Sequence, residues 1–538
     1  MSFNLAAYLQ KNAERTPEKL ALVVPIMDGY RCLSEERVTF AALSQKVSDY
    51  QQGWHRLGLK KGDRVIVLFK PCVDLYAMVI SLIALGMVPV FIDVGMPKKK
   101  VLMALQDSRA KAIITLKSLV RLFWIIPPMW RMKRFAIDGV GFGYRHASVL
   151  SKRAAEQLFS IVDVSPDDHG LISFTSGSTG RPKGADRTQG SLDSQHRILR
   201  AHLPDRENDI DMTSFPVWVL HNLCCGMTTV LPKTDLTRPG DIDAAQVLEQ
   251  IQQEGVTRVS AAPASMEKLT LHMEEARCSL ENVNLVFTGG ATVPVSLAER
   301  MTRVFPNALC KVVYGSTEAE PISSITAAEF VADAEQHDGY LVGKPVQNVE
   351  VCVADLEDKP VSEQEVELNR CADGTIGEIL VSGEHVLKAY VDNVQATNEN
   401  KVKRANNTVW HRTGDTGFFD ADGRIWLTGR VKDVISVNGI NIQPFPLEKK
   451  IDEMSGVARS ALIQAEGTII LFVAPGIPAE PDFFGELTNL FRAVGLPQVK
   501  LVEADRIPVD ARHNSKIDRP LLRNMIAEGD IDIRGVIS

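Results

Sequence analysis

The stretch Thr175-Ser-Gly-Ser-Thr-Gly-Arg-Pro-Lys-Gly184 directly follows the apolar run Leu171-Ile-Ser-Phe174. The run predicts a short buried strand, and the glycines and hydroxyl side chains after it predict a loop whose backbone N–H groups surround an anion. Arg181 and Lys183 add positive charge, so a polyphosphate is the expected ligand. A surface turn would explain the Ser, Thr, Gly and Pro residues but not the two cations. The stretch has no Gly-x4-Gly-Lys-Ser/Thr pattern, which argues against an ordinary P-loop NTPase.

Strand-like and helical runs alternate on both sides of this loop. The alternation predicts an α/β fold in which helices cover a largely parallel sheet. The runs expected as strands are 64–69, 88–93, 111–115, 258–261 and 285–287, and those expected as helices are 3–15, 39–57, 72–86, 97–108 and 243–255.

The pattern changes past residue 340. Short extended segments separated by Gly, Asp and Asn predict a mostly antiparallel sheet subdomain there. Near Gly429-Arg-Val-Lys-Asp433 a further unit of strand, turn and helix begins. We therefore expect a large N-terminal domain, residues 1–429, made of parallel-sheet α/β subdomains plus the β subdomain. A small mobile α+β domain, residues 430–538, is expected to follow it.

The composition restricts the class of protein. The 538 residues are 45% hydrophobic and 24% charged, which is typical of a globular protein with more than one domain. The net charge of −7 gives no case for nucleic-acid binding. The eight cysteines show no C-x-x-C spacing, so we expect reduced core residues of a cytoplasmic protein. The N-terminus lacks a basic region followed by an apolar core, so no signal peptide is expected.

Residues 118–134 combine two tryptophans, other apolar residues and a group of arginine and lysine side chains. One interpretation is an interfacial segment that touches a membrane or a lipid-like substrate. The alternative is ordinary core with a solvated rim, since Pro127-Pro128 would break any continuous amphipathic helix. The sequence leaves both interpretations open.

Four more motifs follow the loop: Thr288-Gly-Gly-Ala291, Tyr314-Gly-Ser-Thr-Glu318, His411-Arg-Thr-Gly-Asp415 and Gly429-Arg430. Each alone could be a turn with a charged rim. The ordered set of five resembles the acyl-adenylate-forming superfamily, which includes acyl-CoA synthetases, luciferases and peptide-synthetase adenylation domains. The resemblance implies ATP and Mg²⁺ as cofactors. It also implies a first half-reaction in which a carboxylate and MgATP give an acyl-adenylate and pyrophosphate.

The resemblance assigns a role to each motif. Thr317 is expected to contact the α-phosphate, Glu318 to hold Mg²⁺ through its carboxylate, and Tyr314 to stack on adenine. Asp415, ionised, is expected to accept hydrogen bonds from the ribose hydroxyls. The other expected nucleotide-binding residues are Thr175, Ser176, Gly177, Ser178, Thr179, Gly180, Lys183, Gly289, Gly290, Ala291, Gly315, Ser316 and Arg430, with Thr175 also expected at the metal.

The motif Arg512-His-Asn-Ser-Lys-Ile-Asp-Arg519 lies near the C-terminus. The superfamily places a catalytic lysine there, and Lys516 matches by position although Ser515 replaces the usual glycine. A cation is needed because the carboxylate must approach a polyphosphate of like charge. Two other positions depart from frequent family patterns. Gln189 stands where many relatives have histidine, and Lys432 stands where they often have aspartate at the expected hinge.

The second nucleophile is not specified by the core motifs. Segment 211–228, together with the C-terminal motif and the basic tryptophan-containing segment, is most similar to the olefin-biosynthesis β-lactone synthetases. In that family the hydroxyl of a β-hydroxy acid closes a four-membered ring. A fatty-acyl-CoA ligase, which would add CoA as a cosubstrate, or an amide-forming acyl ligase is the alternative. His221 and the cysteine pair Cys224-Cys225 match no expectation of that family.

A non-catalytic nucleotide-binding protein of the same fold is disfavoured because Glu318, Asp415 and Lys516 are all present. The expected partner is therefore a small, fatty-acid-like carboxylic acid. Pathway enzymes or a membrane surface contacted through 118–134 are further expected partners.

Overall fold

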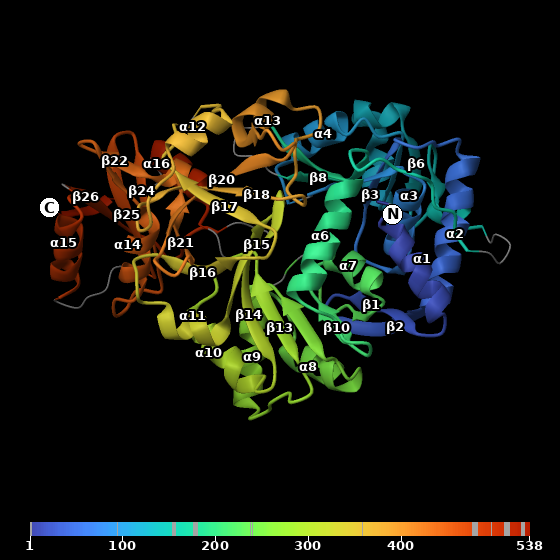
Figure 1. Ribbon diagram of the computed structural model, residues 1–538, viewed down its shortest axis with the longest axis horizontal. Helices are drawn as coiled ribbons and strands as arrows, with labels where there is room; N and C mark the ends of the chain where they lie inside the picture. The colour runs from blue at the N-terminus through green and yellow to red at the C-terminus, as the bar shows by residue number, and fades with distance from the viewer. Residues whose placement is uncertain are drawn as a thin grey trace.

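The computed structural model describes residues 3–93, 95–152, 158–175, 181–236, 238, 240–357, 359–475, 482–496, 498–509 and 517–528, with 533–537 described for the backbone alone. Figure 1 shows the chain from the blue N-terminal helices to the red C-terminal unit. In these residues no helix is long and apolar enough to cross a membrane.

The first sheet has seven strands in the order β7-β6-β5-β3-β4-β8-β9, and every neighbouring pair is parallel except β8 and β9. Consecutive residues of β3 face opposite ways, as period-2 geometry requires: Val65 packs in one core and Ile66 in another. The sheet is therefore covered on both faces. Its strands are β3 (Arg64–Leu68), β4 (Val88–Ile92), β5 (Ala112–Thr115), β6 (Lys133–Ala136), β7 (Arg145–His146), β8 (His169–Thr175) and β9 (Lys183–Thr188).

The helices around this sheet begin and end close to the predicted bounds. One core contains residues of α1 (Ala6–Arg15), α2 (Phe40–Arg56) and α3 (Val73–Ala84). The opposite core contains residues of α4 (Lys98–Asp107), α5 (Lys117–Val120), η1 (Arg121–Ile125) and η2 (Pro127–Arg131). A short turn, η3 (Ala147–Val149), follows β7. The prediction that no continuous helix spans 118–134 is confirmed.

The second sheet has fourteen strands and holds both the parallel and the antiparallel parts of the chain. Its order is β17-β18-β20-β21-β16-β15-β14-β13-β12-β10-β11-β1-β2, with β19 paired to β20. The strands are β1 (Leu20–Asp28), β2 (Arg31–Thr39), β10 (Ile210–Thr213), β11 (Thr228–Val230), β12 (Arg258–Ala261), β13 (Leu285–Gly289), β14 (Leu309–Ser316), β15 (Ala319–Thr326), β16 (Tyr340–Pro345), β17 (Glu350–Ala354), β18 (Gly377–Ser382), β19 (Lys401–Lys403), β20 (Val409–Phe419) and β21 (Ile425–Arg430).

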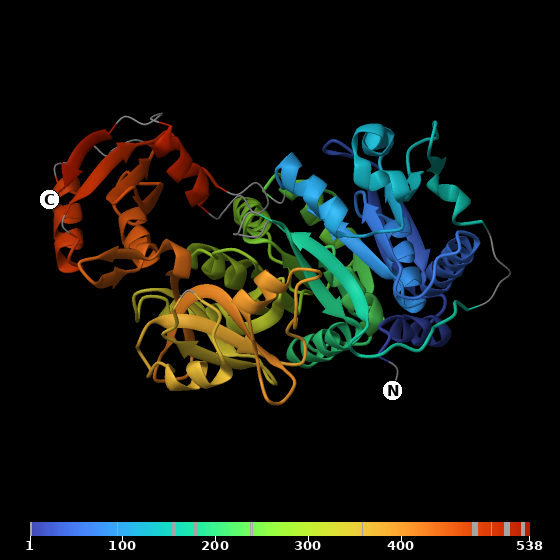
Figure 2. The same cartoon turned by 90° about the horizontal axis from the view of Figure 1, so that it is seen from above.

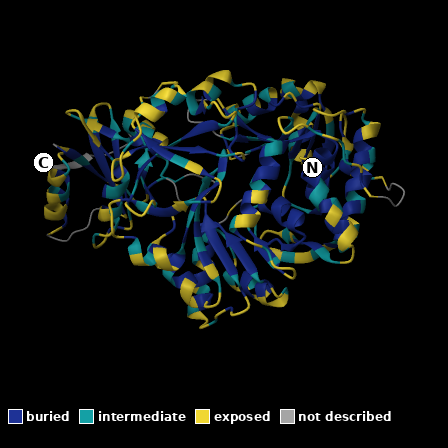
Figure 3. Cartoon of the chain, viewed as in Figure 1, coloured by how far each residue is buried: buried dark blue, intermediate teal, exposed yellow. Residues whose placement is uncertain are grey.

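The prediction of antiparallel pairing past residue 340 is confirmed, and these strands continue the main sheet. The continuity comes from β15, which pairs antiparallel with β14 on one side and β16 on the other. The helices of this region are α6 (Gln189–His202), α7 (Trp218–Cys225), α8 (Ala244–Gln253), α9 (Pro263–Glu275), α10 (Val295–Val304), α11 (Ala327–Asp333), α12 (Glu363–Leu368) and α13 (Val394–Asn400). In Figure 3 the central strands are dark blue and the outer faces of the helices yellow, as expected for a buried sheet.

Residues after 430 build a sheet of their own, β24-β25-β26-β27, next to the two-stranded β22-β23. This unit lies at the red end of the molecule in Figure 2, opposite the N-terminus. The domain boundary at 429/430 stays a prediction. The elements are η4 (Val431–Asp433), β22 (Ile435–Val437), β23 (Ile440–Ile442), α14 (Pro444–Asp452), β24 (Arg459–Ala465), β25 (Thr468–Ala474), α15 (Phe483–Ala493), β26 (Val499–Glu503), α16 (Arg519–Ala527) and β27 (Ile533–Ile537).

Candidate functional site

The predicted phosphate loop joins β8 and β9, two antiparallel strands. Thr175, at the end of β8, is the register partner of Lys183, at the start of β9. The predicted loop ran to Gly184, so its C-terminal boundary was wrong: Lys183 and Gly184 already belong to a strand. The hairpin needs glycine at 184, because a Cβ there would lie 2.9 Å from the Phe174 ring. Ser176, Gly177, Ser178, Thr179 and Gly180 lie outside the described residues.

A second hairpin carries the Tyr-Gly-Ser-Thr-Glu motif. Ser316 and Ala319 are register partners in β14 and β15, so Thr317 and Glu318 form the two-residue turn between these strands. The guanidinium of Arg187, from β9, donates to the backbone oxygen of Thr317 at 3.0 Å. This contact ties the Thr317-Glu318 turn to the hairpin that carries Lys183.

Glu318 lies in a cluster with one tyrosine and two lysines. The Tyr390 hydroxyl donates to Glu318 Oε1 at 2.8 Å. The Nζ atoms of Lys183 and Lys401 lie 5.2 Å and 5.5 Å from the centroid of the Tyr390 ring. Lys183 Nζ also donates to Asn400 Oδ1 at 3.4 Å, one residue before Lys401. A carboxylate, a phenol and two ammonium groups thus meet beside the predicted phosphate loop.

The charges of this cluster depend on one another. Burial would raise the pKa of Glu318, but His411, Lys401 and the Tyr390 hydroxyl lower it to about 2. Burial lowers the pKa of His411 to about 3, so that imidazole is neutral at pH 7. Burial also lowers the pKa of Lys401 to about 7, although the Glu318 carboxylate opposes the shift. Glu318 is therefore ionised, and Lys401 rather than His411 can carry the compensating positive charge.

Lys401 was not among the residues that sequence reasoning selected. Its ammonium is buried and has no hydrogen-bond partner among the residues that the structure describes. In register it lies opposite His411, the first residue of the His-Arg-Thr-Gly-Asp motif. That pairing is the signal that could have identified it, but it requires knowing that β19 pairs with β20. A buried ammonium without a partner is costly unless a ligand anion offsets the cost.

A second cluster joins three motif residues. Tyr314 donates its hydroxyl proton to Asp415 Oδ2 at 2.6 Å, and Arg430 Nε lies 2.9 Å from Asp415 Oδ1. Asp415 and Arg430 are register partners in β20 and β21. Burial, and then the Asp415 carboxylate, raise the pKa of Tyr314, which stays a neutral donor. The structure thus brings together Tyr314, Asp415 and Arg430, with each carboxylate oxygen keeping a lone pair for another donor.

The Thr288–Ala291 motif ends β13, beside β14. Gly289 is the register partner of Val313, the residue before Tyr314. A Cβ at Gly289 would lie 2.3 Å from the Val313 carbonyl oxygen, and Gly290 has a φ of +83°. Glycine at these positions therefore has a structural reason apart from contact with a ligand.

Lys516 lies outside the described residues, but the arginine that closes its motif does not. Arg519 is buried and bridges Glu448, at 2.7 Å, and Asp433, at 3.2 Å. Asp433 is the last residue of η4, the turn that contains Lys432. Arg519 thus anchors the start of α16 within the C-terminal unit, next to the predicted hinge.

Segment 211–228 contributes α7, whose polar side chains are buried. His221 Nδ1 lies 3.0 Å from His196 Nδ1 of α6, and His221 Nε2 lies 3.6 Å from Cys225 Sγ. Burial lowers the pKa of His196 to about 4, so this imidazole is neutral at pH 7. His221 and Cys225, which the sequence could not place, thus belong to a polar contact chain between two helices.

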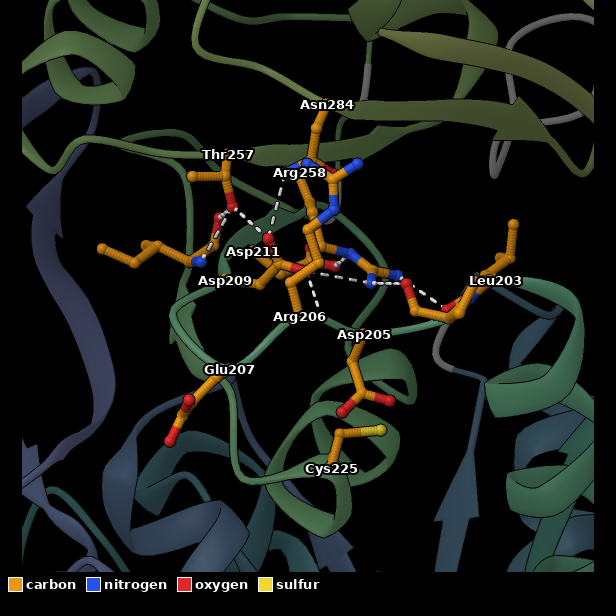
Figure 4. Close-up of polar contacts among 12 residues, drawn as sticks. Leu203, Asp205, Arg206, Glu207, Asp209, Asp211, Cys225, Thr257, Arg258 and Asn284 are labelled. Atoms are coloured by element: carbon orange, nitrogen blue, oxygen red, sulfur yellow. Dashed lines mark hydrogen bonds and ion pairs between the residues drawn. The ribbon is translucent and has the colours of Figure 1, made fainter.

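A buried ion network fixes the start of the same segment (Figure 4). Arg258, on β12, lies 3.4 Å from both Asp209 and Asp211 and donates to the Leu203 backbone oxygen at 3.3 Å. Burial raises the pKa of Asp211 to about 6, although Arg258 opposes the shift. Breaking such a network by removing one partner costs about 3–5 kcal/mol, so it holds β10, β12 and the end of α6 in place.

Comparisons with known proteins identify the family and the fold of the chain. The family model described as AMP-binding enzyme matches residues 9–391. The chain is 28% identical to an olefin beta-lactone synthetase of Xanthomonas campestris pv. campestris, over 96% of both chains. It is also 28% identical to a putative acyl–CoA ligase, YdaB, of Bacillus subtilis, over 80% of this chain and 81% of that one. The fold is similar to that of ATP-bound MatB from Rhodopseudomonas palustris, with a TM-score of 0.80 and 21% identity over 98% and 99% of the two chains.

Proposed function

Because the chain belongs to the family of AMP-binding enzymes and is an acyl-adenylate-forming ligase, we propose that it activates a fatty or 3-hydroxy fatty acid as the acyl-adenylate and closes the 3-hydroxy acyl-adenylate to a β-lactone. One observation supports the first step most directly. The described residues bring Glu318, Tyr390, Lys183 and Lys401 together at the two hairpins that carry the family motifs.

The residues fit MgATP as cosubstrate and metal. An ionised, buried carboxylate suits Mg²⁺, which prefers oxygen ligands, and the two ammonium groups suit a polyphosphate. We propose Glu318 as the metal ligand, with Thr175 beside it. Lys183 and the loop residues Ser176, Gly177, Ser178, Thr179 and Gly180 would hold the phosphates. Asp415 would hold the ribose, and Tyr314, Gly315, Ser316, Gly289, Gly290 and Ala291 the adenine side.

The residues of the chain contribute charge and position to adenylation. Bound MgATP supplies an electrophilic α-phosphorus and a pyrophosphate leaving group. Lys183 and Lys401 place positive charge where negative charge grows as pyrophosphate leaves, and Thr317 would contact the α-phosphate. Tyr390 holds the Glu318 carboxylate in one orientation. We propose that Lys516, on the C-terminal unit, neutralises the repulsion between the incoming carboxylate and the phosphates.

The second step is proposed as ring closure. The 3-hydroxyl oxygen attacks the acyl carbonyl carbon, the bond from that carbon to the AMP oxygen breaks so that AMP leaves, and the hydroxyl proton passes to solvent. Full-length similarity to two olefin beta-lactone synthetases supports this choice. A tethered hydroxyl has an effective concentration of up to about 10⁵ M or more, so no external acceptor is needed.

The proposal predicts the products of a 2-alkyl-3-hydroxy acid incubated with MgATP and no CoA. We expect one AMP and one pyrophosphate for each product, whose mass equals that of the acid minus water. A fatty acid without the hydroxyl should stop at the bound adenylate. Mass spectrometry of the products, with and without CoA, measures this. A thioester that forms from the plain fatty acid only with CoA would instead establish the acyl-CoA ligase that the similarity to YdaB suggests.

Asp415 offers a separate test of nucleotide binding. Asp415→Asn should raise the KM for ATP by about tenfold with a smaller effect on kcat, because a charged acceptor for the ribose becomes neutral. Steady-state pyrophosphate release measures both constants. Asp422→Asn, an exposed change in the turn between β20 and β21, is the matched control. An unchanged KM for ATP would show that Asp415 serves only to hold Tyr314 and Arg430.

A further inference from the structure

Residues 117–145 form an aromatic and basic surface at one edge of the first sheet. The segment connects β5 to β6 and β7, the outermost strands on that side. It contains α5, η1 and η2 and the turn between Gly141 and Tyr144. Figure 2 shows this end of the molecule far from the red C-terminal unit. We call it the 117–145 surface.

The side chains of this surface divide into an inner and an outer set. Phe123, Ile126 and Met129 are buried and belong to the core beneath the sheet. Between them, Trp124 and Ile125 are 60% and 75% exposed. The core thus accounts for the inner set only, and the solvated rim of this segment includes large apolar side chains.

The exposed apolar side chains come from three separate turns. Trp130, Val140 and Phe142 are 59%, 68% and 80% exposed. Trp124 and Phe142 stack with their ring centroids 5.6 Å apart, so the turns of η1 and 140–143 form one apolar surface. The Trp130 indole is held by a 2.8 Å hydrogen bond to the Phe123 backbone oxygen. Apolar groups gathered in this way on a protein surface mark an interaction site.

The same segment is rich in positive charge. Between residues 117 and 145 the sequence has six cations and a single acid, Asp138, in a chain whose net charge is −7. The cations are Lys117, Arg121, Arg131, Lys133, Arg134 and Arg145. Among the described residues none of these six forms an ion pair, although Arg134 lies over the Phe123 ring, 4.1 Å from its centroid. The surface thus offers cations to an anionic partner.

We propose that the 117–145 surface binds the surface of an anionic lipid bilayer. Tryptophan and phenylalanine bury their rings at the boundary between headgroups and acyl chains, and lysine and arginine attract anionic headgroups. Here the tips of short turns would insert into the headgroup region. They take the place of a continuous amphipathic helix, which Pro127 and Pro128 prevent. Membrane binding would bring the enzyme to a substrate that partitions into lipid. That last consequence rests on the proposed fatty-acid substrate, whereas the binding itself does not.

Vesicle co-sedimentation of the full chain tests the proposal. We expect at least about tenfold stronger binding to phosphatidylcholine vesicles containing about one third phosphatidylglycerol than to phosphatidylcholine alone. The double variant Trp124→Ser/Phe142→Ser and the double variant Arg121→Gln/Arg131→Gln should each weaken binding about tenfold or more. Leu368→Ser and Lys403→Gln are the matched controls, because both change exposed side chains outside this surface.

Two measurements separate this proposal from others. Adenylation of a short, water-soluble acid should be unchanged in both double variants, so a loss there would indicate misfolding or a role in catalysis. Light scattering without lipid reports self-association. Equal vesicle binding by wild-type and variant chains would overturn the proposal. So would a Trp124→Ser/Phe142→Ser variant that loses self-association but keeps its vesicle binding.

Discussion

Glu318→Gln is expected to lower the rate of acyl-adenylate formation by about 10²–10³-fold, because it removes the charge from the proposed Mg²⁺ ligand while keeping its shape. The carboxylate is buried, yet its pKa lies at about 2, so the charge is present over the whole physiological range. The Tyr390 hydroxyl can still donate to the amide oxygen of the variant. The change therefore tests charge at Glu318 rather than the integrity of the cluster.

Carboxylate-dependent exchange of radiolabelled pyrophosphate into ATP measures this half-reaction without the second step. The matched control is Glu399→Gln, which removes another negative charge near Lys183 but none that bonds to Tyr390. It should leave the exchange rate within about twofold, as expected for a change away from the reacting groups. A higher Mg²⁺ concentration should partly restore the Glu318 variant. Exchange at near wild-type rates would show that Glu318 is not the metal ligand.

The sequence predicted most of the fold because its signals are local. The alternation of apolar runs specifies strands such as β3 and helices such as α2 within a residue or two. In the hairpin at 175–184, the glycine and hydroxyl residues favoured a loop that continues to Gly184. Pairing with β8 overrode it, because Gly184 packs against the Phe174 ring. Strand pairing depends on residues outside the paired segment. The residue types at 183 and 184 therefore could not indicate it.

In the candidate site, too, local motifs were predictable from the sequence and contacts between distant residues were not. The motifs made Glu318 and Asp415 candidates because their short patterns are specific, and the structure brings Tyr314 and Arg430 within hydrogen-bond distance of Asp415. Lys401 is different. It belongs to no motif and lies in the three-residue strand Lys401–Lys403. The alternation of lysine and valine in this strand is typical of an exposed edge strand. Both lysines of this strand pair with β20, opposite His411 and Val409, but only Lys401 is buried. Its burial depends on residues far away in the sequence, Glu318 among them, which no local pattern indicates.

Lys401→Met is expected to lower kcat/KM for ATP by about 100-fold in the pyrophosphate-exchange assay, with little change in the KM for the carboxylic acid. The methionine fills the same space but removes the ammonium proposed to face the phosphates. Lys401→Arg should recover part of the loss, because it restores the charge. Lys403→Met is the matched control: it lies two residues away on the same strand, but its side chain is exposed.

Thermal unfolding separates a functional from a structural Lys401. A buried ammonium without a hydrogen-bond partner lowers the stability of the free chain, because the Glu318 charge and the Tyr390 ring only partly replace its lost hydration. Lys401→Met should therefore unfold at the same or a higher temperature than the wild-type chain while it loses activity. Charged residues that bind a ligand often lower the stability of the free protein, so their removal raises stability and lowers activity. If the variant instead unfolds earlier and keeps its exchange activity, Lys401 serves to hold Glu318 and Tyr390 in the fold.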